Sequence, residues 1–184
     1  MEINEKHILA NCQAGKLEEF GKIYEKYVKK IYNFTYYKTS SREVAEDLTS
    51  QAFFKALSRI DQFDTSGSFS AWIYTIARNG IIDYYRSNHP QSNIEDAFDL
   101  VDGTNIERDI DAKEDLKKVK EYIKSLNSTQ REILMLRIWE GMSYKEIADI
   151  TGKSETNCRI IFSRAISKVR EQALLALFII IFLS

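Results

Sequence analysis

MSYKEIADITGKSETNCRIIFSRAISKVRE, residues 142–171, has the most specific structural pattern in the chain. Ser143 and Glu146 have the spacing of a capping box, which predicts that a short helix begins at this point. Gly152 follows that helix, and glycine readily adopts the left-handed backbone needed in the turn between two closely packed helices. Ser154 is then placed to cap a second helix. The stretch therefore predicts a helix-turn-helix.

The second helix of this motif has two chemically different faces. Small and apolar residues recur at the spacing of a buried stripe, namely Cys158, Phe162, Ala165 and Val169. This leaves Arg159, Ser163 and Arg164 facing outward, where the major groove of DNA could receive them. An ordinary helical hairpin with arginines on its surface is the alternative interpretation of the same pattern.

The composition fits a soluble, helical protein with two modules. Of the 184 residues, 29% are charged and 44% are apolar, with one Pro and seven Gly. The net charge of −1 hides an uneven distribution, because residues 91–115 carry two basic and nine acidic side chains, whereas residues 116–184 carry twelve and seven. We therefore expect an all-α fold of two small helical domains, at residues 1–88 and 113–172, joined by an acidic linker at 89–112.

The first domain contains three segments with helical periodicity. In the first segment the apolar residues share one face, at Phe20, Ile23, Tyr24, Tyr27, Val28 and Ile31. Ser40 and Glu43 have capping-box spacing, so a second helix is expected from there to about residue 57. Its expected buried side chains are Val44, Leu48, Phe53, Phe54 and Leu57. A third helix is expected over about 69–86, because Pro90 disfavours helix beyond it.

The sequence offers no recognisable chemistry of catalysis or metal binding. Its only cysteines are Cys12 and Cys158 and its only histidines are His7 and His89, without the spacing of a zinc site or a disulfide framework. We find no nucleophile–base set or glycine-rich phosphate loop, so we expect no catalytic residue, no metal and no cofactor. The N-terminal sequence lacks the pattern of a secretion signal, so a cytoplasmic location is expected.

Two parts of the chain resemble the sigma-70 family of bacterial RNA polymerase sigma factors. Residues 42–57, REVAEDLTSQAFFKAL, and residues 69–86, FSAWIYTIARNGIIDYYR, are similar to the second conserved region of that family. Residues 126–155, LNSTQREILMLRIWEGMSYKEIADITGKSE, are similar to the fourth region. The order of these segments and the acidic stretch between them resemble the small extracytoplasmic-function subgroup.

The resemblance, which extends over roughly residues 10–172, implies a transcription initiation factor rather than an enzyme. Such a factor binds core RNA polymerase through the β′ clamp helices and the β flap, directs it to promoter DNA and helps to melt that DNA. The family also implies an anti-sigma protein as a partner. The acidic linker would thread polymerase channels that otherwise hold nucleic acid, and a flexible solubilising linker is the alternative.

The resemblance assigns the polar face of the helix at 42–57 to polymerase binding. The residues implied are Glu46, Asp47, Ser50 and Gln51. The family commonly has Gln and Glu at positions 50 and 51, so Asp47 is the more secure assignment. On the residues alone, a solvated charged face is the simpler interpretation.

The segment from residue 61 to residue 86 is implied to recognise and melt the downstream (−10) element. The residues implied are Asp61, Phe63, Trp72, Tyr74, Arg78, Asn79 and Arg86. Aromatic faces can stack on unpaired bases and cations can hold phosphates. In the family, the loop at 61–70 together with Asn79 helps to hold a base flipped from the non-template strand. We expect Trp72 and at least one tyrosine to pack in the core instead.

The second helix of the helix-turn-helix is implied to read the upstream (−35) element. The residues implied are Ser154, Thr156, Arg159, Ile160, Ser163 and Arg164. An arginine that forms two hydrogen bonds to guanine would give most of the base discrimination. Ile160 and Ile161 stand where the family often has Ser and Arg. This loss of polar contacts changes the expected promoter preference.

Two other classes of function remain open on the sequence. A conventional helix-turn-helix regulator would bind its operator without polymerase and would use its first domain for sensing or dimerisation. An adaptor that sequesters sigma factors would keep the polymerase-binding face but would not need Arg159 and Arg164.

The C-terminal stretch ALLALFIIIFL, residues 173–183, is a run of eleven apolar residues. A membrane-spanning helix needs about 20 such residues, so this run is too short to span a membrane by itself. Packing on the preceding domain, binding a partner and lying in a membrane interface are the alternatives, of which membrane association is not expected because a basic amphipathic face is also lacking. The family resemblance does not predict this tail, and its role is unexplained.

Overall fold

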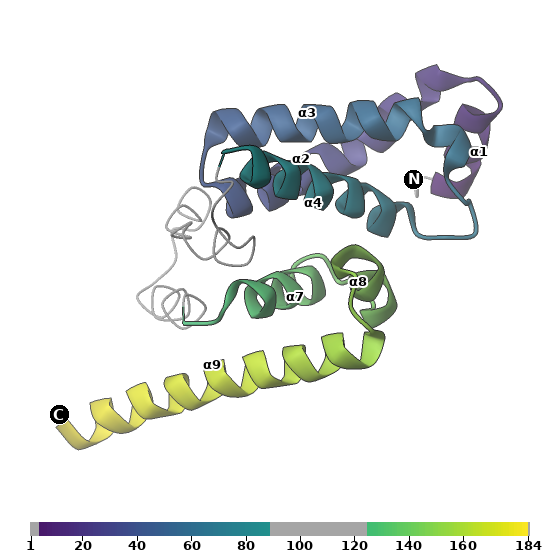
Figure 1. Ribbon diagram of the computed structural model, residues 1–184. Coiled ribbons are helices and arrows are strands. Elements are labelled where there is room, and N and C mark those ends of the chain that lie inside the picture. The colour runs from purple at the N-terminus through teal and green to yellow at the C-terminus, as the bar shows by residue number, and fades with distance from the viewer. Residues whose placement is uncertain (1–3, 89–124, 184) are drawn as a thin grey trace. The chain divides into compact units, whose positions relative to one another are not determined.

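The computed structural model describes residues 4–88 and 125–183, with side chains as far as residue 171. It divides into two compact units, unit 1 (Met1–Ala97) and unit 2 (Phe98–Ser184), drawn in Figure 1. Within the described ranges every regular element is a helix, as predicted. The predicted linker at 89–112 lies outside the described residues.

Unit 1 is a bundle built mainly from three long helices. Its elements are α1 (Glu5–Gln13), a 3₁₀ turn (Leu17–Glu19), α2 (Phe20–Thr39), α3 (Arg42–Ser58), a second 3₁₀ turn (Ile60–Gln62) and α4 (Phe69–Asn88). The helices α2, α3 and α4 pack against one another, and α1 packs on α2 (Figure 1). The three predicted helical segments of the first domain are therefore confirmed.

Aromatic rings fill the centre of unit 1 around Phe69, which is 1% exposed. Its ring centroid lies 5.5 to 6.3 Å from those of Phe20, Tyr27, Phe63 and Trp72. The rings meet edge-to-face or tilted, which are arrangements that aromatic pairs prefer. Phe69 thus ties the start of α4 to α2 and to the loop that precedes α4.

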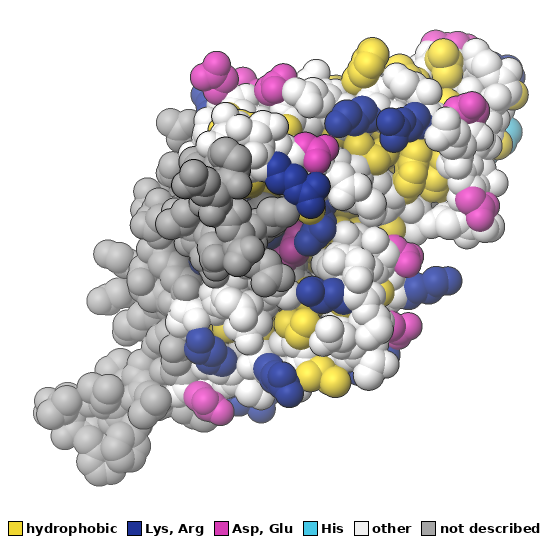
Figure 2. Space-filling model, in the orientation of Figure 1, with side chains coloured by type: hydrophobic (Ala, Val, Ile, Leu, Met, Phe, Trp, Pro, Cys, Tyr) yellow, Lys and Arg dark blue, Asp and Glu magenta, His cyan; other side chains and the backbone are white. Residues whose placement is uncertain are grey.

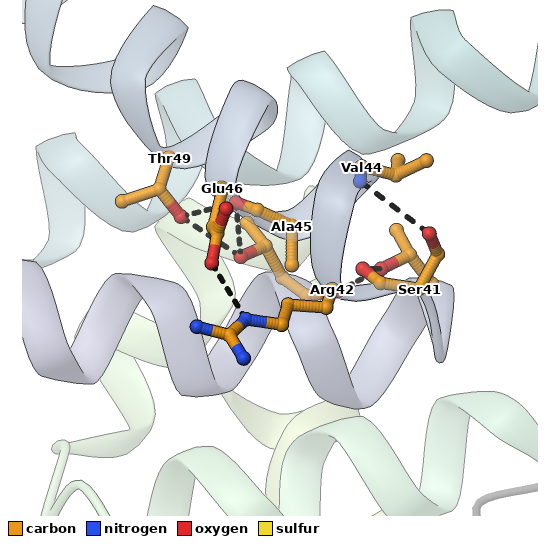
Figure 3. Close-up of polar contacts among 8 residues, drawn as sticks. Ser41, Arg42, Val44, Ala45, Glu46 and Thr49 are labelled. Carbon is orange, nitrogen blue, oxygen red and sulfur yellow. Dashed lines mark hydrogen bonds and ion pairs between the residues drawn. The ribbon is translucent and has the colours of Figure 1, made fainter.

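The corner between α2 and α3 uses two serines in different ways. Ser40 ends α2 with a left-handed backbone (φ 50°), and its N–H donates to the carbonyl of Tyr36 at 2.8 Å. The hydroxyl oxygen of Ser41 then accepts from the N–H of Val44 at 3.4 Å and caps α3 (Figure 3). The prediction that Ser40 is the cap was wrong by one residue, because the left-handed end of α2 already occupies that position.

The buried side of α3 consists largely of small residues. Its buried residues are Ala45, Leu48, Thr49, Ala52, Phe53 and Ala56. The prediction was correct for Leu48 and Phe53 but wrong for Phe54, whose side chain is 72% exposed. The alanines face the neighbouring helices instead, and this rotates Phe54 outward. In α2, Tyr24 is likewise more exposed than predicted, although its ring contacts Phe53 at a centroid distance of 4.9 Å.

Two buried polar contacts join the helices of unit 1. The hydroxyls of Thr35 on α2 and Thr49 on α3 lie 3.0 Å apart. The hydroxyl of Tyr85, near the end of α4, donates to the carbonyl oxygen of Lys38 on α2 at 2.7 Å. Burial raises the pKa of Tyr85 to about 12. The neutral phenol is therefore the form that the fold accommodates.

Unit 2 contains the predicted helix-turn-helix. Its described helices are α7 (Ser128–Ile138), α8 (Tyr144–Thr151) and α9 (Glu155–Leu183). The capping box of Ser143 and Glu146 is confirmed at the start of α8. Gly152 ends α8 with a φ of 68°, and the hydroxyl of Ser154 accepts from the N–H of Asn157 at 3.2 Å. The pattern at 142–171 thus predicted the caps, the turn and the order of these helices.

The core of unit 2 forms where α7 and α8 pack against α9. Its fully buried side chains, each 0% exposed, are Ile133, Leu136, Ile147, Cys158 and Ala165. The continuous helix α9 extends through the apolar tail to Leu183. Among the residues that the structure describes, no helix is both long enough and apolar enough to cross a membrane.

We predict that Tyr85→Phe lowers the stability of unit 1 by about 1 kcal/mol near pH 8, because the carbonyl of Lys38 loses a buried donor. The folded-state pKa of Tyr85 is raised, so its contribution is complete below about pH 10 and is lost as the pH rises towards 12. The difference between wild type and variant should therefore close by about pH 11. Urea unfolding followed by Trp72 fluorescence, with Trp139→Phe present in both proteins, measures this difference in the free energy of unfolding.

Tyr84→Phe is the matched control, since it removes the neighbouring phenol and keeps the ring that contacts Tyr85. The stability of this variant should still fall as the pH rises towards 12, as that of the wild type does, because Tyr85 keeps its hydrogen bond to the carbonyl of Lys38. A Tyr85→Phe difference that is independent of pH would contradict the assigned role of the buried phenol.

Candidate functional site

The exposed side of α3 presents four polar residues that the sequence predicted as a binding face. Glu46, Asp47, Ser50 and Gln51 are all exposed. Figure 2 shows acidic side chains over the first part of α3 and hydrophobic ones further along it. The helix therefore offers a charged and an apolar area on one side.

Short-range contacts along α3 order these polar side chains. Arg42 donates through Nε to Oε1 of Glu46 at 2.9 Å, one helical turn away (Figure 3). Gln51 donates to Oδ2 of Asp47 at 2.7 Å across the next turn. Both pairs are exposed, so they add little to stability. They leave carboxylate oxygens of Glu46 and Asp47 available to an incoming donor.

Phe54 belongs to the same surface, and the sequence analysis missed it. At about 100° per residue, Phe54 lies near the middle of the arc from Glu46 to Gln51. A side chain of this size that is 72% exposed is unusual for phenylalanine. We call Glu46, Asp47, Ser50, Gln51 and Phe54 the α3 face. An apolar ring surrounded by polar groups is a typical composition for the centre of a protein–protein interface.

The loop before α4 is held in place by α1, through a residue that the sequence analysis did not identify. The side-chain amide of Gln13 donates to the carbonyl of Ile60 at 2.9 Å and to that of Phe63 at 2.7 Å. These bonds fix the turn that carries Asp61, whose side chain is exposed. No local sequence pattern could have revealed this contact, because the partners are 47 and 50 residues apart.

The tip of this loop is a compact turn around Asp64. Its carboxylate accepts hydrogen bonds from the backbone N–H and the hydroxyl of Ser66, at 2.9 and 2.8 Å. The same hydrogen bonds hold the pKa of Asp64 below its usual value. The N–H of Gly67 also donates to the carbonyl of Asp64 at 2.9 Å. Residues 64–67 of the loop at 61–70 thus form an ordered turn.

Two aromatic residues predicted to contact DNA are part of the core. Tyr74 is 0% exposed and its ring contacts Phe34 at a centroid distance of 5.1 Å. Phe63 is 7% exposed and packs between Phe69 and Trp72. Their side chains support the fold and do not face solvent, which corrects the implied DNA contact of Phe63; for Tyr74, burial agrees with the expectation that at least one tyrosine packs in the core. Trp72, which was expected in the core, remains partly exposed beside them.

The outer side of α4 keeps the other predicted residues together. Trp72, Asn79 and Arg86 follow one another at intervals of seven, so they lie on nearly the same side of the helix. Asn79 and Arg86 are exposed, and Arg78 is partly exposed next to Asn79. We call Trp72, Arg78, Asn79 and Arg86 the α4 face. It combines an aromatic edge, an amide and two cations, which suits contact with a nucleic acid strand.

The outward side of α9 carries the residues predicted to read DNA. Thr156, Arg159, Ile160, Ser163 and Arg164 are all exposed, and we call them the α9 face. Ser154, at the start of the helix, is also exposed and serves as its cap. On the opposite side, Cys158 and Ala165 are fully buried, as predicted.

Arg159 is held by a set of contacts that join α7, α8 and α9, the helices of unit 2 that the structure describes. Its guanidinium lies 4.8 Å from the ring centroid of Tyr144 and bonds Glu155 at 2.9 Å. Arg137 lies at 4.8 Å from the same ring and donates to the carbonyl of Met142 at 2.6 Å. Tyr144 is thus in contact with two arginines. The spacing of Glu155 and Arg159 could have predicted their ion pair, but nothing in the sequence predicted the role of Tyr144.

In the part of the chain that the structure describes, the remaining titratable groups do not suggest a reactive centre. Within the described parts of the chain, no His, Cys, Asp and Glu side chains group as metal ligands would. Cys12 and Cys158 are buried, reduced cysteines, and burial raises the pKa of the Cys12 thiol. Raised pKa values disfavour the reactive thiolate, so Cys12 is best explained by packing.

Comparison with known proteins matches parts of both units to regions of one family. Residues 23–90 match Sigma-70 region 2, and residues 116–169 match Sigma-70, region 4. The chain is 30% identical over 152 residues to the ECF RNA polymerase sigma factor SigM of Bacillus subtilis, covering 80% of this chain and 91% of that protein. It is 32% identical over 164 residues to the ECF RNA polymerase sigma factor BldN of Streptomyces coelicolor, covering 86% of this chain. The match spans 62% of BldN, less than two thirds of its length.

A solved structure has the same fold. It is the sigma factor RpoE of Bartonella quintana, crystallised in complex with the anti-sigma factor NepR. The TM-score is 0.65 at 26% identity, and the similarity covers 85% of this chain and 97% of that one.

We predict that Tyr144→Leu destabilises unit 2 by about 1 kcal/mol, because it removes the ring from both arginines, whereas Tyr144→Phe keeps the ring and should have little effect. Amide hydrogen exchange in α7 and α8 should become about fivefold faster in the Leu variant only. Equal exchange rates in the two variants would mean that the arginine–ring contacts do not stabilise this unit.

Proposed function

The chain belongs to the sigma-70 family of RNA polymerase sigma factors, in its extracytoplasmic-function subgroup, and we propose that it directs core polymerase to specific promoters and helps to open the DNA there. The observation that supports this best is the presence, in one chain, of the α3 face within the region 2 match and the α9 face within the region 4 match. A sigma factor of this kind is an initiation factor, and we propose no catalytic activity of its own and a cytoplasmic site of action.

We propose that the α3 face binds the β′ clamp helices of the polymerase. Its carboxylates can accept hydrogen bonds from basic residues, and Glu46 and Asp47 are exposed and ordered for that purpose. Phe54 supplies the apolar area at the centre of such an interface. Region 4 would bind the β flap, and the acidic segment at 89–112 would enter a basic channel of the polymerase.

We propose that the α9 face reads the upstream promoter element. Arg159 and Arg164 are exposed on the second helix of a helix-turn-helix, the part of this motif that enters the major groove. The contact of Arg159 with the ring of Tyr144 restricts its side chain before DNA arrives. A restricted arginine loses less conformational entropy when it bonds guanine, so it favours discrimination between bases.

The α4 face and the ordered loop at 61–70 are proposed to capture the melted strand of the downstream element. Arg78 and Arg86 can hold phosphates, and the exposed part of Trp72 offers a surface for stacking. Asp61 and Asn79 would bond the edge of a flipped base beside the turn that Gln13 fixes.

We also propose that an anti-sigma protein controls this factor. The relative RpoE was solved in complex with its anti-sigma factor NepR, and the shared fold supports a partner of the same class here. Such a partner would cover surfaces that bind polymerase.

Run-off transcription with purified core polymerase on a library of genomic promoters tests the proposed function. Discrete transcripts that require both the polymerase and this protein are expected, and their shared upstream sequences would define its promoters. Tight binding of the protein alone to duplex DNA, without such transcripts, would instead support a conventional helix-turn-helix regulator.

Asp47→Lys should reduce the affinity for core polymerase by at least about 100-fold, since it places a cation where an acceptor is needed and leaves the exposed helix folded. Glu25→Lys, an equal change of charge on the exposed side of α2, should bind normally. Fluorescence anisotropy of the labelled protein titrated with core polymerase measures both. Equal affinities for the two variants would remove Asp47 from the interface.

Phe54→Ala should weaken polymerase binding by about tenfold, because an apolar anchor at the centre of an interface contributes more than its rim. The melting temperature should be unchanged, since the side chain is 72% exposed in the free protein. Leu17→Ala removes another exposed apolar side chain, 48% exposed, from the 3₁₀ turn before α2 and should leave the affinity unaltered. If both variants bind like wild type, Phe54 is not part of the polymerase contact.

A further inference from the structure

Ile160 is an apolar side chain in the middle of the α9 face. It is 44% exposed, although isoleucine is among the residues most often buried. At about 100° per residue, it lies about 200° around the helix from the fully buried Cys158. It therefore points almost directly away from the core of unit 2, and no rotation of α9 could bury it without exposing Cys158.

The residues around Ile160 indicate which groups its side chain would contact. Thr156 and Arg164 lie about 40° to either side of it, one helical turn before and one after. Arg159 lies on its flank, ion-paired with Glu155 and in contact with Tyr144. An apolar group between two cations on the outward side of this helix would be brought against the base edges of the major groove.

The major groove offers one kind of apolar group. Base edges there present hydrogen-bond donors and acceptors, and thymine adds its 5-methyl group. An isoleucine opposite a donor or acceptor would desolvate that group without bonding it, which is unfavourable. Resting on the proposed function, we propose that Ile160 selects a thymine in the upstream element by packing against its 5-methyl group.

The geometry of α9 also limits where this thymine lies. Ile160 and Arg164 are four residues apart, about 6 Å along the helix axis. Base pairs follow one another at about 3.4 Å. The thymine should thus be within about two base pairs of the base that Arg164 contacts.

Replacing thymine by deoxyuridine tests this directly, because it removes the methyl group and leaves every hydrogen-bonding group in place. We would substitute each thymine of the upstream element in turn, on a promoter recovered from the run-off experiment, and measure binding of the assembled holoenzyme. At one position the affinity should fall about fourfold, the effect of one buried methyl-sized group. The other thymines should tolerate the change.

Variants of the protein then assign the effect to Ile160. Holoenzyme with Ile160→Ser should bind the normal promoter more weakly than wild type by a similar factor. Its affinity should not fall further on the deoxyuridine promoter, because the contact between the side chain and the methyl group is already lost. Ile138→Ser is the matched control, because Ile138 is 52% exposed on α7 and should retain the full deoxyuridine effect.

Two results would overturn the inference while leaving the sigma-factor function intact. One is that the holoenzyme uses its promoters but its affinity is unchanged by deoxyuridine at every thymine of the upstream element. The other is an Ile160→Ser variant that keeps the full sensitivity. If the holoenzyme gives no discrete transcripts at all, the proposed function itself fails and this inference fails with it.

Discussion

Small side chains between packed helices determine which way the α3 face and the α9 face point. On α3, Ala45, Ala52 and Ala56 are at most 2% exposed and let the helix pack against α2 and α4. A rotation of α3 by one residue, about 100°, would bury Glu46 and expose Ala45. Cys158 and Ala165 have the same effect on α9 where it packs against α7 and α8. The residues that pack in the core therefore determine which residues of α3 and α9 face solvent.

The contacts of Arg159 suggest how binding strength and selectivity are balanced on the α9 face. In the free protein its guanidinium is shared between the carboxylate of Glu155 and the ring of Tyr144. The ion pair is largely exposed, so exchanging it for a base or phosphate costs little. If the α9 face reads DNA as proposed, Glu155 would also repel nearby phosphates and so lower the general affinity for DNA. Unit 2 by itself should then bind DNA modestly, and the polymerase would provide the additional affinity.

The sequence predicted those features that depend on local chemistry. The capping box at Ser143, the left-handed Gly152 and the cap at Ser154 all involve neighbouring residues, and the structure confirms each of them. Features that depend on how a helix is rotated about its axis were harder to predict from the sequence. Phe54 was expected inside because it is large and apolar, but alanines occupy the interior. Phe63 and Tyr74 were implied by the family resemblance to contact DNA and both are buried, whereas Trp72, which was expected in the core, is partly exposed. Contacts between distant residues, such as those of Gln13 with the loop, have no local signature.

The hydroxyl pair of Thr35 and Thr49 has a consequence for the alignment of α2 and α3 along their axes. Apolar stripes are tolerant of sliding, since one methyl group can replace another with little loss. Here each hydroxyl bonds a carbonyl of its own helix and also meets the other hydroxyl, at 3.0 Å, inside the core. A slip of one turn would place both against hydrocarbon. The pair thus favours a single register, and with it the position of the exposed ring of Phe54 along α2.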